Sequence, residues 1–389
     1  MTNREARSPA LDGVRGVAIL LVLFWHMYAR IPRPGWTQNF VPLEWLANVG
    51  WSGVQLFFVL SGFLIARILL QHRGQPGYFR TFYLRRTTRI FPLYYLCIGS
   101  YLLVRYWLPP AVYAPLAPLI DNQTLSFWPY ALFAQNYVMA SIGTLGGHWL
   151  GVTWSLAVEE QFYLVLPLLI AFAPPAAFRR ILLLLVMLAP LLRFFCLLTN
   201  SASALSVVVL LPTRIDGFAL GALIALAVLQ PSAPPPARIR LLTLIALLLF
   251  VATQMLLPRT TGPLQTALIA FNHTPFALVF GCLILWVTAI PGGRAARVLS
   301  ARPLVWLGSA SYFIYLFHQP VHYLVHWAVN GISPALMTVS GVATTLLALV
   351  ILFGLAEVSR RFFEQPLIAL GHRFSYGARD RLPTNASVP

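Results

Sequence analysis

The sequence predicts an all-α protein in which about ten helices cross a membrane as one bundle. Of its 389 residues, 59% are hydrophobic and 10% are charged, whereas a soluble domain carries about 25% charged residues. A spanning helix needs about 20 mostly apolar residues. Stretches of this kind lie near 13–30, 50–70, 90–108, 154–173, 181–199, 205–229, 239–257, 266–290, 304–327 and 334–358.

The positions of the arginines predict how the bundle is oriented. The formal net charge is +17, and basic residues concentrate in cytoplasmic loops. If the N-terminus is cytoplasmic, nearly all loop arginines fall on that side, in the connections that contain 71–89, 179–180, 238–240 and 294–302 and in the tail after 359. We therefore expect both termini in the cytoplasm. Because the arginines are spread among loops, the charge does not indicate a nucleic-acid partner.

One long stretch, 109–153, does not fit a spanning helix. It is rich in Pro, Gly, Trp and Tyr, and its run 127–139 is short and polar. We expect it to form an outer loop with a re-entrant or surface helix packed on the bundle. The rest of the chain reads as one membrane domain over 1–370, followed by a disordered cytoplasmic tail over 371–389.

Two of the expected helices contain ionisable residues that a lipid environment disfavours. Arg15 and His26 stand in LDGVRGVAILLVLFWH, and Glu159 and Glu160 stand in WSLAVEEQFYLVLPLLIAF. Each such group costs on the order of 3 kcal/mol near a bilayer centre, so it usually faces the protein interior and marks a functional site.

The spacing of these residues predicts a general base. Arg15 and His26 lie on one stripe of a helix, about 20° apart around its axis and roughly 16 Å apart along it. Ser155 and Glu159 share one face of a later helix, with Trp154 expected at the outer interface. This places Glu159 at a depth similar to that of His26. We predict that the Glu159 carboxylate orients His26 as a base and that Glu160 points elsewhere.

Ser61 and His318 are further polar candidates within apolar runs. His318 lies in SYFIYLFHQP, with His322 and His326 one and two turns later. No further metal-ligating residue falls in that run, so a structural or substrate-contact role is favoured and no metal is expected. Ser61 lies in GVQLFFVLSGFLI, where a close helix crossing or a ligand contact is favoured over a nucleophile.

A group of arginines lies near the expected cytoplasmic end of the second and third spans. Arg86 and Arg89 occur in RRTTRIFP, and Arg67 ends the preceding span. They could be ordinary cytoplasmic charge or a clamp for a phosphorylated ligand, because arginine binds phosphate in a bidentate manner. Arg214 and Asp216 are expected to form a buried pair.

Five of these stretches together resemble the acyltransferase-3 family of membrane O-acyltransferases. They are LDGVRGVAILLVLFWH, GVQLFFVLSGFLI, FYLRRTTRIFPLYY, WSLAVEEQFYLVLP and SYFIYLFHQP, in the expected order across 11–320. The resemblance implies a ten-helix domain of the bacterial inner membrane. It also implies transfer of an acyl group, commonly acetyl, from cytosolic acyl-coenzyme A to a hydroxyl of a cell-envelope glycan or glycolipid.

The resemblance and the residues give one set of site predictions. Arg15, Arg67, Arg86 and Arg89 would bind the coenzyme's phosphates, and His26 with Glu159 would activate the acceptor hydroxyl. Contacts with substrate are expected from Ser61, Trp154, Ser155 and His318. The alternative is a proton-coupled transporter, since buried His and Glu also build proton relays. Against it, the sequence shows no inverted-repeat signature.

Overall fold

The regular secondary structure of the chain is helical. The computed structural model describes residues 8–35, 41–107, 109, 116–121, 126–199, 203–230 and 234–377, and this part contains no strand. The prediction of an all-α protein is confirmed.

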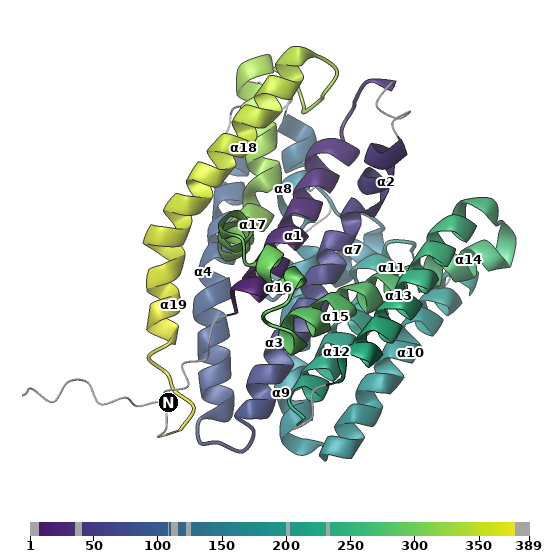
Figure 1. The fold of residues 1–389 in the computed structure, drawn as a ribbon. Coiled ribbons are helices and arrows are strands. Elements are labelled where there is room, and N and C mark those ends of the chain that lie inside the picture. Colours follow the sequence, from purple (N-terminus) through teal and green to yellow (C-terminus); the bar gives the residue numbers. More distant parts are fainter. Residues whose placement is uncertain are drawn as a thin grey trace, which may run out of the picture.

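Figure 1 shows the longer helices packed as a bundle. They are α1 (Pro9–Phe24), α2 (Val41–Val49), α3 (Gly53–Gln71), α4 (Tyr78–Trp107), α7 (Gln135–Ile142), α9 (Trp154–Phe172), α10 (Pro175–Thr199), α12 (Leu211–Val228), α13 (Pro236–Leu256), α14 (Gly262–Phe271), α15 (His273–Ala289), α17 (Arg302–Asn330) and α18 (Val339–Ser359). The shorter ones are α6 (Phe127–Ala131), α8 (His148–Gly151), α11 (Ser206–Val209), α16 (Arg294–Leu299) and α19 (Gln365–Gly371), with π-helical turns η1 (Trp25–Ala29) and η5 (Arg360–Glu364). Helices far apart in the sequence, such as α1 and α17, lie side by side in the bundle (Figure 1).

Eight helical segments in the described part are long and apolar enough to cross a membrane. The remaining two predicted spans fall on α4 and α17, which are 30 and 29 residues long and so measure about 45 Å at 1.5 Å per residue. Both contain polar stretches, so they are not counted among the eight segments that are apolar enough to cross a membrane. The structure is that of a polytopic membrane protein.

The outward faces of several helices suit contact with lipid. Within the apolar window of the segment that contains α13, only 6% of residues are buried by the rest of the chain, and 22% in α10. Figure 1 shows α10, α13 and α14 along one side of the bundle, with α4, α18 and α19 along the other. An apolar helix with so little protein contact requires another apolar medium around it.

The stretch predicted not to span holds α6 and α7, which have 5 and 8 residues and cannot cross a bilayer. Its final part differs from the prediction. Helix α8 leads almost directly into α9, and the two form one candidate span, His148–Phe172. This span therefore begins six residues earlier than the sequence pattern indicated, a difference that changes the depth of every residue in α9.

The C-terminal prediction is partly wrong. Residues 372–377 were assigned to a disordered tail, but they pack on α4: the Thr81 hydroxyl donates to the Ser375 carbonyl at 2.9 Å, and Arg85 Nε donates to the Phe374 carbonyl at 2.9 Å. The Tyr376 ring stacks on His72 at 4.0 Å. The remaining tail residues, 378–389, lie outside the described part.

Helices α1 and α17 cross so closely that glycine is required at the contact. A Cβ on Gly308 would lie 1.8 Å from the Asp12 carbonyl oxygen, and one on Gly16 would lie 2.2 Å from the Leu304 carbonyl oxygen. Small residues at such crossings let the two backbones approach. The crossing fixes which residues of α1 and α17 can meet along the rest of both helices.

Substitution of Gly308 should therefore destabilise the bundle. We expect Gly308→Ala to lower the free energy of unfolding by about 1–3 kcal/mol, because the new methyl group overlaps backbone atoms that cannot rotate away. The change is measured by thermal unfolding in detergent. Gly354→Ala is the control, since a Cβ at Gly354 meets nothing within 4 Å. Equal melting temperatures for the two variants would show that the crossing is loose.

Candidate active site

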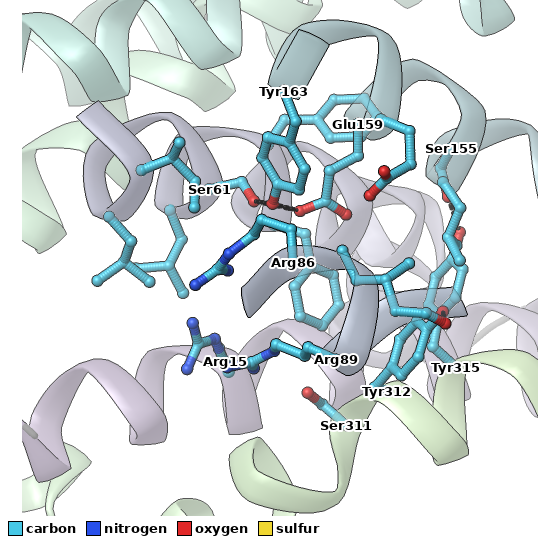
Figure 2. Close-up of a pocket in the computed structure, with 18 of the residues that line it drawn as sticks. Arg15, Ser61, Arg86, Arg89, Ser155, Glu159, Tyr163, Ser311, Tyr312 and Tyr315 are labelled. Carbon is cyan, nitrogen blue, oxygen red and sulfur yellow. Dashed lines mark hydrogen bonds between the residues drawn. The ribbon is translucent and has the colours of Figure 1, made fainter. Parts of the chain in front are cut away.

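A cavity of about 100 Å³ lies between α1, α3, α4, α9 and α17. Figure 2 shows arginine side chains gathered on one side of it, with hydroxyl and carboxylate groups on the other. Six predicted site residues line it: Arg15, Ser61, Arg86, Arg89, Ser155 and Glu159. The fold thus brings together residues from four helices that are far apart in the sequence.

The arginine side of the cavity carries three guanidinium groups, of which only that of Arg15 forms an ion pair with a described residue. Arg15 forms an ion pair with Asp12 at 3.0 Å between Nη1 and Oδ1. Neither Arg86 nor Arg89 has an ion pair with a described residue, and the buried Nε of Arg86 has no hydrogen-bond partner there. Guanidinium groups left unpaired in an apolar bundle are costly, and a phosphate or carboxylate would satisfy them with charge-assisted bonds.

The opposite side holds a cluster of three oxygen-bearing groups (Figure 2). The Ser61 and Tyr163 hydroxyls both donate to Oε1 of Glu159, and the two hydroxyl oxygens lie 2.6 Å apart. Glu159 and Tyr163 meet because they are four residues apart on α9, whereas Ser61 comes from α3. The Glu159 carboxylate is therefore held at the wall of the cavity by hydroxyls from two helices.

Glu160 also lines this cavity, and its buried Oε1 has no partner among the described residues. Glu160 was expected to point away from His26, and the cavity that it lines does not include His26. The cavity is wide enough along α9 to include two consecutive residues of that helix.

His26 does not line the cavity. It lies in the π-helical turn that continues α1, and such turns are frequent at functional sites. Its Nδ1 donates to the Val22 carbonyl at 3.0 Å, and its ring centroid lies 4.9 Å from that of His318. The carbonyl bond fixes the proton on Nδ1, so the neutral ring has its lone pair on Nε2.

The predicted hydrogen bond between His26 and Glu159 is wrong: the side-chain bonds of Glu159 go to Ser61 and Tyr163. The reason is the length of the span. It begins at His148, so Glu159 lies about 16 Å along it, at the depth of the arginines and not of His26. The individual roles of His26 and Glu159 remain predictions.

Ser155 and Tyr315 stand between the cavity and the two histidines. Their hydroxyl oxygens are 2.5 Å apart, and the Tyr315 hydroxyl also donates to the Val152 carbonyl at 3.2 Å. Tyr315 lines the cavity, while its ring centroid is 6.2 Å from that of His318. The cavity therefore reaches to within one side chain of the histidine pair.

The remaining predicted residues lie elsewhere. Arg67 is half-buried on α3 and does not line the cavity. Trp154 is buried, not interfacial: its ring packs edge-on against Phe58 at 6.0 Å, because α8 extends the span beyond it. Sequence reasoning missed Ser311, Tyr312 and Tyr315, which line the cavity from α17. Their signal was a polar stripe, continued by His318, on an otherwise apolar helix.

A second buried polar cluster lies apart from this cavity. Asp216 pairs with Arg193 at 2.9 Å, and Arg214 bonds His273 Nδ1 at 2.6 Å. The predicted Arg214–Asp216 pair is wrong, because residues two apart on a helix point about 200° from each other. No group of three or more metal-ligating residues occurs within the described ranges.

The chain belongs to the acyltransferase-3 family: the family's acyltransferase domain matches residues 8–353. The resemblance seen in the sequence is thereby confirmed, and it favours a transferase over a transporter. The chain is 27% identical to the peptidoglycan O-acetyltransferase OatA of Listeria monocytogenes, over 94% of this chain and 57% of the relative. It is 26% identical to the O-acetyltransferase OatA of Staphylococcus aureus, over 94% and 58%.

The chain thus spans a little over half the length of these relatives. No solved structure matches it.

Proposed function

We propose that this chain transfers an acyl group, most simply acetyl, from cytosolic acyl-coenzyme A to a hydroxyl of a cell-envelope saccharide. The observation that carries the proposal is the cavity, in which Arg86 and Arg89 are unpaired inside an apolar bundle. Two relatives named for O-acetylation support the acetyl group, and the one named for peptidoglycan supports a glycan acceptor.

The proposed orientation places the arginine end of the cavity towards the cytoplasm. Arg73, Arg80 and Arg85 belong to the same α3–α4 region as Arg86, and such concentrations of charge mark the cytoplasmic side. A donor made in the cytosol would then reach the arginines first. The histidine pair would face the outer half of a bacterial inner membrane, where an envelope acceptor is found.

In this arrangement the arginines bind the donor's phosphates, and the cavity receives its acyl end. A cavity of about 100 Å³ has room for a few groups the size of a water molecule. It therefore suits the thioester and its acyl chain, with the nucleotide remaining at the mouth. The thioester would lie between the Glu159 cluster and Tyr315, close to the two histidines.

The chemistry then divides between the two ends of the site. His26 accepts the acceptor's hydroxyl proton at Nε2 while the hydroxyl oxygen attacks the thioester carbonyl. The carbon–sulfur bond breaks, and the thiolate of the coenzyme takes a proton from the Ser61, Tyr163 and Glu159 cluster. That cluster lies beside the arginines and regains its proton from the cytosol. His26 is thus a base at one end, and Glu159 is part of a proton donor at the other.

Donor binding should depend on the unpaired arginines. We expect Arg86→Ala and Arg89→Ala each to weaken acetyl-coenzyme A binding by roughly 10- to 100-fold, because a charge-assisted contact is worth about 1.5–3 kcal/mol. Calorimetry on the detergent-purified chain measures this. The control is Arg80→Ala, which removes an exposed cation from the same helix outside the cavity. If all three variants bind acetyl-coenzyme A equally well, Arg86 and Arg89 serve only to orient the protein in the membrane.

His26 should matter for chemistry and not for donor binding. We expect His26→Ala to lower the transfer rate by about 10²–10⁴-fold, the usual effect of losing a general base. Donor affinity should change little, because His26 does not line the cavity. The rate is followed as labelled acetate incorporated into glycan by membranes that contain the chain. Transfer within threefold of wild type, roughly 0.6 kcal/mol, would remove His26 from the mechanism.

The two neighbouring glutamates provide a matched comparison. Glu159→Gln removes the carboxylate that accepts from the Ser61 and Tyr163 hydroxyls, and we expect it to slow transfer by about 10²-fold or more. Glu160→Gln keeps the size and place of a cavity-lining carboxylate that has no bond to either hydroxyl. Its rate should stay within about tenfold of wild type. The reverse order would assign the donor role to Glu160.

A further inference from the structure

Beyond the cavity, α17 carries a line of buried histidines that the proposed chemistry does not yet use. His318, His322 and His326 follow one another at intervals of four residues and are 0%, 2% and 0% exposed, so they share one face of the helix. Thr345 of α18 faces the last two. We call these four residues the histidine line.

His318, the first member of the histidine line, lies beside His26 in an arrangement that suits proton transfer. His318 Nδ1 donates to the carbonyls of Ile314 and Tyr315 at 3.1 and 2.8 Å, so its lone pair is on Nε2. That nitrogen is buried and has no partner among the described residues. His26 also has its lone pair on Nε2, with the rings 4.9 Å apart. Two basic nitrogens so placed can share a proton directly or through one water.

The far members are bridged by a single hydroxyl. Thr345 Oγ1 lies 3.2 Å from His322 Nε2 and 2.9 Å from His326 Nε2. A hydroxyl can donate one proton and accept others, so Thr345 can accept from one histidine while it donates to the other. A proton that moves from His322 to His326 exchanges these two roles. His326 Nδ1, buried and without a partner in the described chain, is the next acceptor, one turn before α17 ends at Asn330.

We propose that the histidine line carries the acceptor's proton from His26 to the outer end of α17. The inference rests on the proposed function, because the proton originates in acyl transfer. When the acceptor's O–H bond breaks, the proton moves to His26 Nε2, then to His318, His322, Thr345 and His326, and leaves to outer water. The coenzyme's thiolate gains a different proton from the cytosolic side, so each turnover moves one proton equivalent outwards.

The alternative path, back into the cavity, has a less favourable geometry. The Tyr315 hydroxyl already donates to the Val152 carbonyl at 3.2 Å and contacts Ser155 Oγ at 2.5 Å. Its own proton is therefore bonded to a carbonyl oxygen, which cannot carry a proton further. On the outer side, the other titratable rings beside the histidine line are His148 and Tyr323, whose ring centroids lie 5.1 Å apart in a stack. The hydrogen bonds of the Thr345 hydroxyl are with His322 and His326.

The first test compares two adjacent threonines of α18. Thr345→Val removes the bridging hydroxyl and retains the side chain's shape, whereas Thr344→Val removes a hydroxyl that accepts from Asn330 at 3.0 Å, off the line. Washed membranes that contain the full chain receive radiolabelled acetyl-coenzyme A and use the glycan already present. We expect Thr345→Val to slow transfer by about tenfold or more with unchanged donor affinity, and Thr344→Val to leave the rate within twofold, about 0.4 kcal/mol.

The second test separates proton transfer from structural support. His326→Ala should also slow transfer, and added imidazole should restore much of the rate, because a free imidazole can occupy the space and shuttle the proton. A purely structural histidine would not be rescued. If wild-type membranes label glycan but Thr345→Val matches Thr344→Val, or imidazole restores nothing, the histidine line is not a relay. If wild-type membranes label nothing, the proposed function itself fails, and this inference with it.

Discussion

The close crossing of α1 and α17 is the contact on which the rest of the site depends. It exists because Gly16 and Gly308 leave no side-chain atoms between the two backbones. With the helices held at this distance, Arg15 near one end of α1 reaches the cavity that Ser311, Tyr312 and Tyr315 line. At the other end of α1, His26 meets His318. One crossing therefore positions both ends of the proposed reaction path.

The electrostatics of the bundle depend on which charged side chains it buries with an ion-pair partner and which without one. Arg193 and Asp216 neutralise each other, and a buried ion pair of this kind is a structural unit with little net effect on stability. Arg86 and Arg89 have no such carboxylate within the described residues. A protein that keeps cations unpaired in an apolar interior pays in stability unless a ligand supplies the anion. The contrast between the paired Arg193 and the unpaired Arg86 and Arg89 distinguishes a binding site from a structural ion pair. The number of charges alone does not.

The two ends of the site also differ in chemistry. Around Glu159, hydroxyls are fixed by a carboxylate and lie beside arginines. Around His26, two histidine rings lie 4.9 Å apart, and Nδ1 of each is bonded to a helix carbonyl. The first environment suits release of a proton to a leaving thiolate, and the second suits its removal from a hydroxyl. Ser155 and Tyr315 lie between the Glu159 environment and the His26 environment. They separate the group that gives up a proton from the group that takes one.

The sequence by itself determined the class of fold, the family and six of the residues that line the cavity. Apolar periodicity is local, so lengths of about 20 residues identify membrane helices without any tertiary information. Ionisable residues inside such helices are costly wherever they face lipid, so Arg15 and Glu159 were expected to face the interior. For Arg86 and Arg89 the sequence left open both a cytoplasmic loop and a ligand-binding role. Five motifs in register were enough to indicate the acyltransferase family.

Only the tertiary structure decided which of these residues meet. Helical spacing predicted that Ser155 and Glu159 share a face, but depth along a span depends on where the span begins. Helix α8, hidden in a Trp- and Gly-rich loop, moved that start to His148 and placed Glu159 with Ser61. Likewise, the pairing of His26 with His318 and of Thr345 with two histidines joins separate helices. Such contacts are set by side-chain packing between helices, which one-dimensional periodicity does not encode.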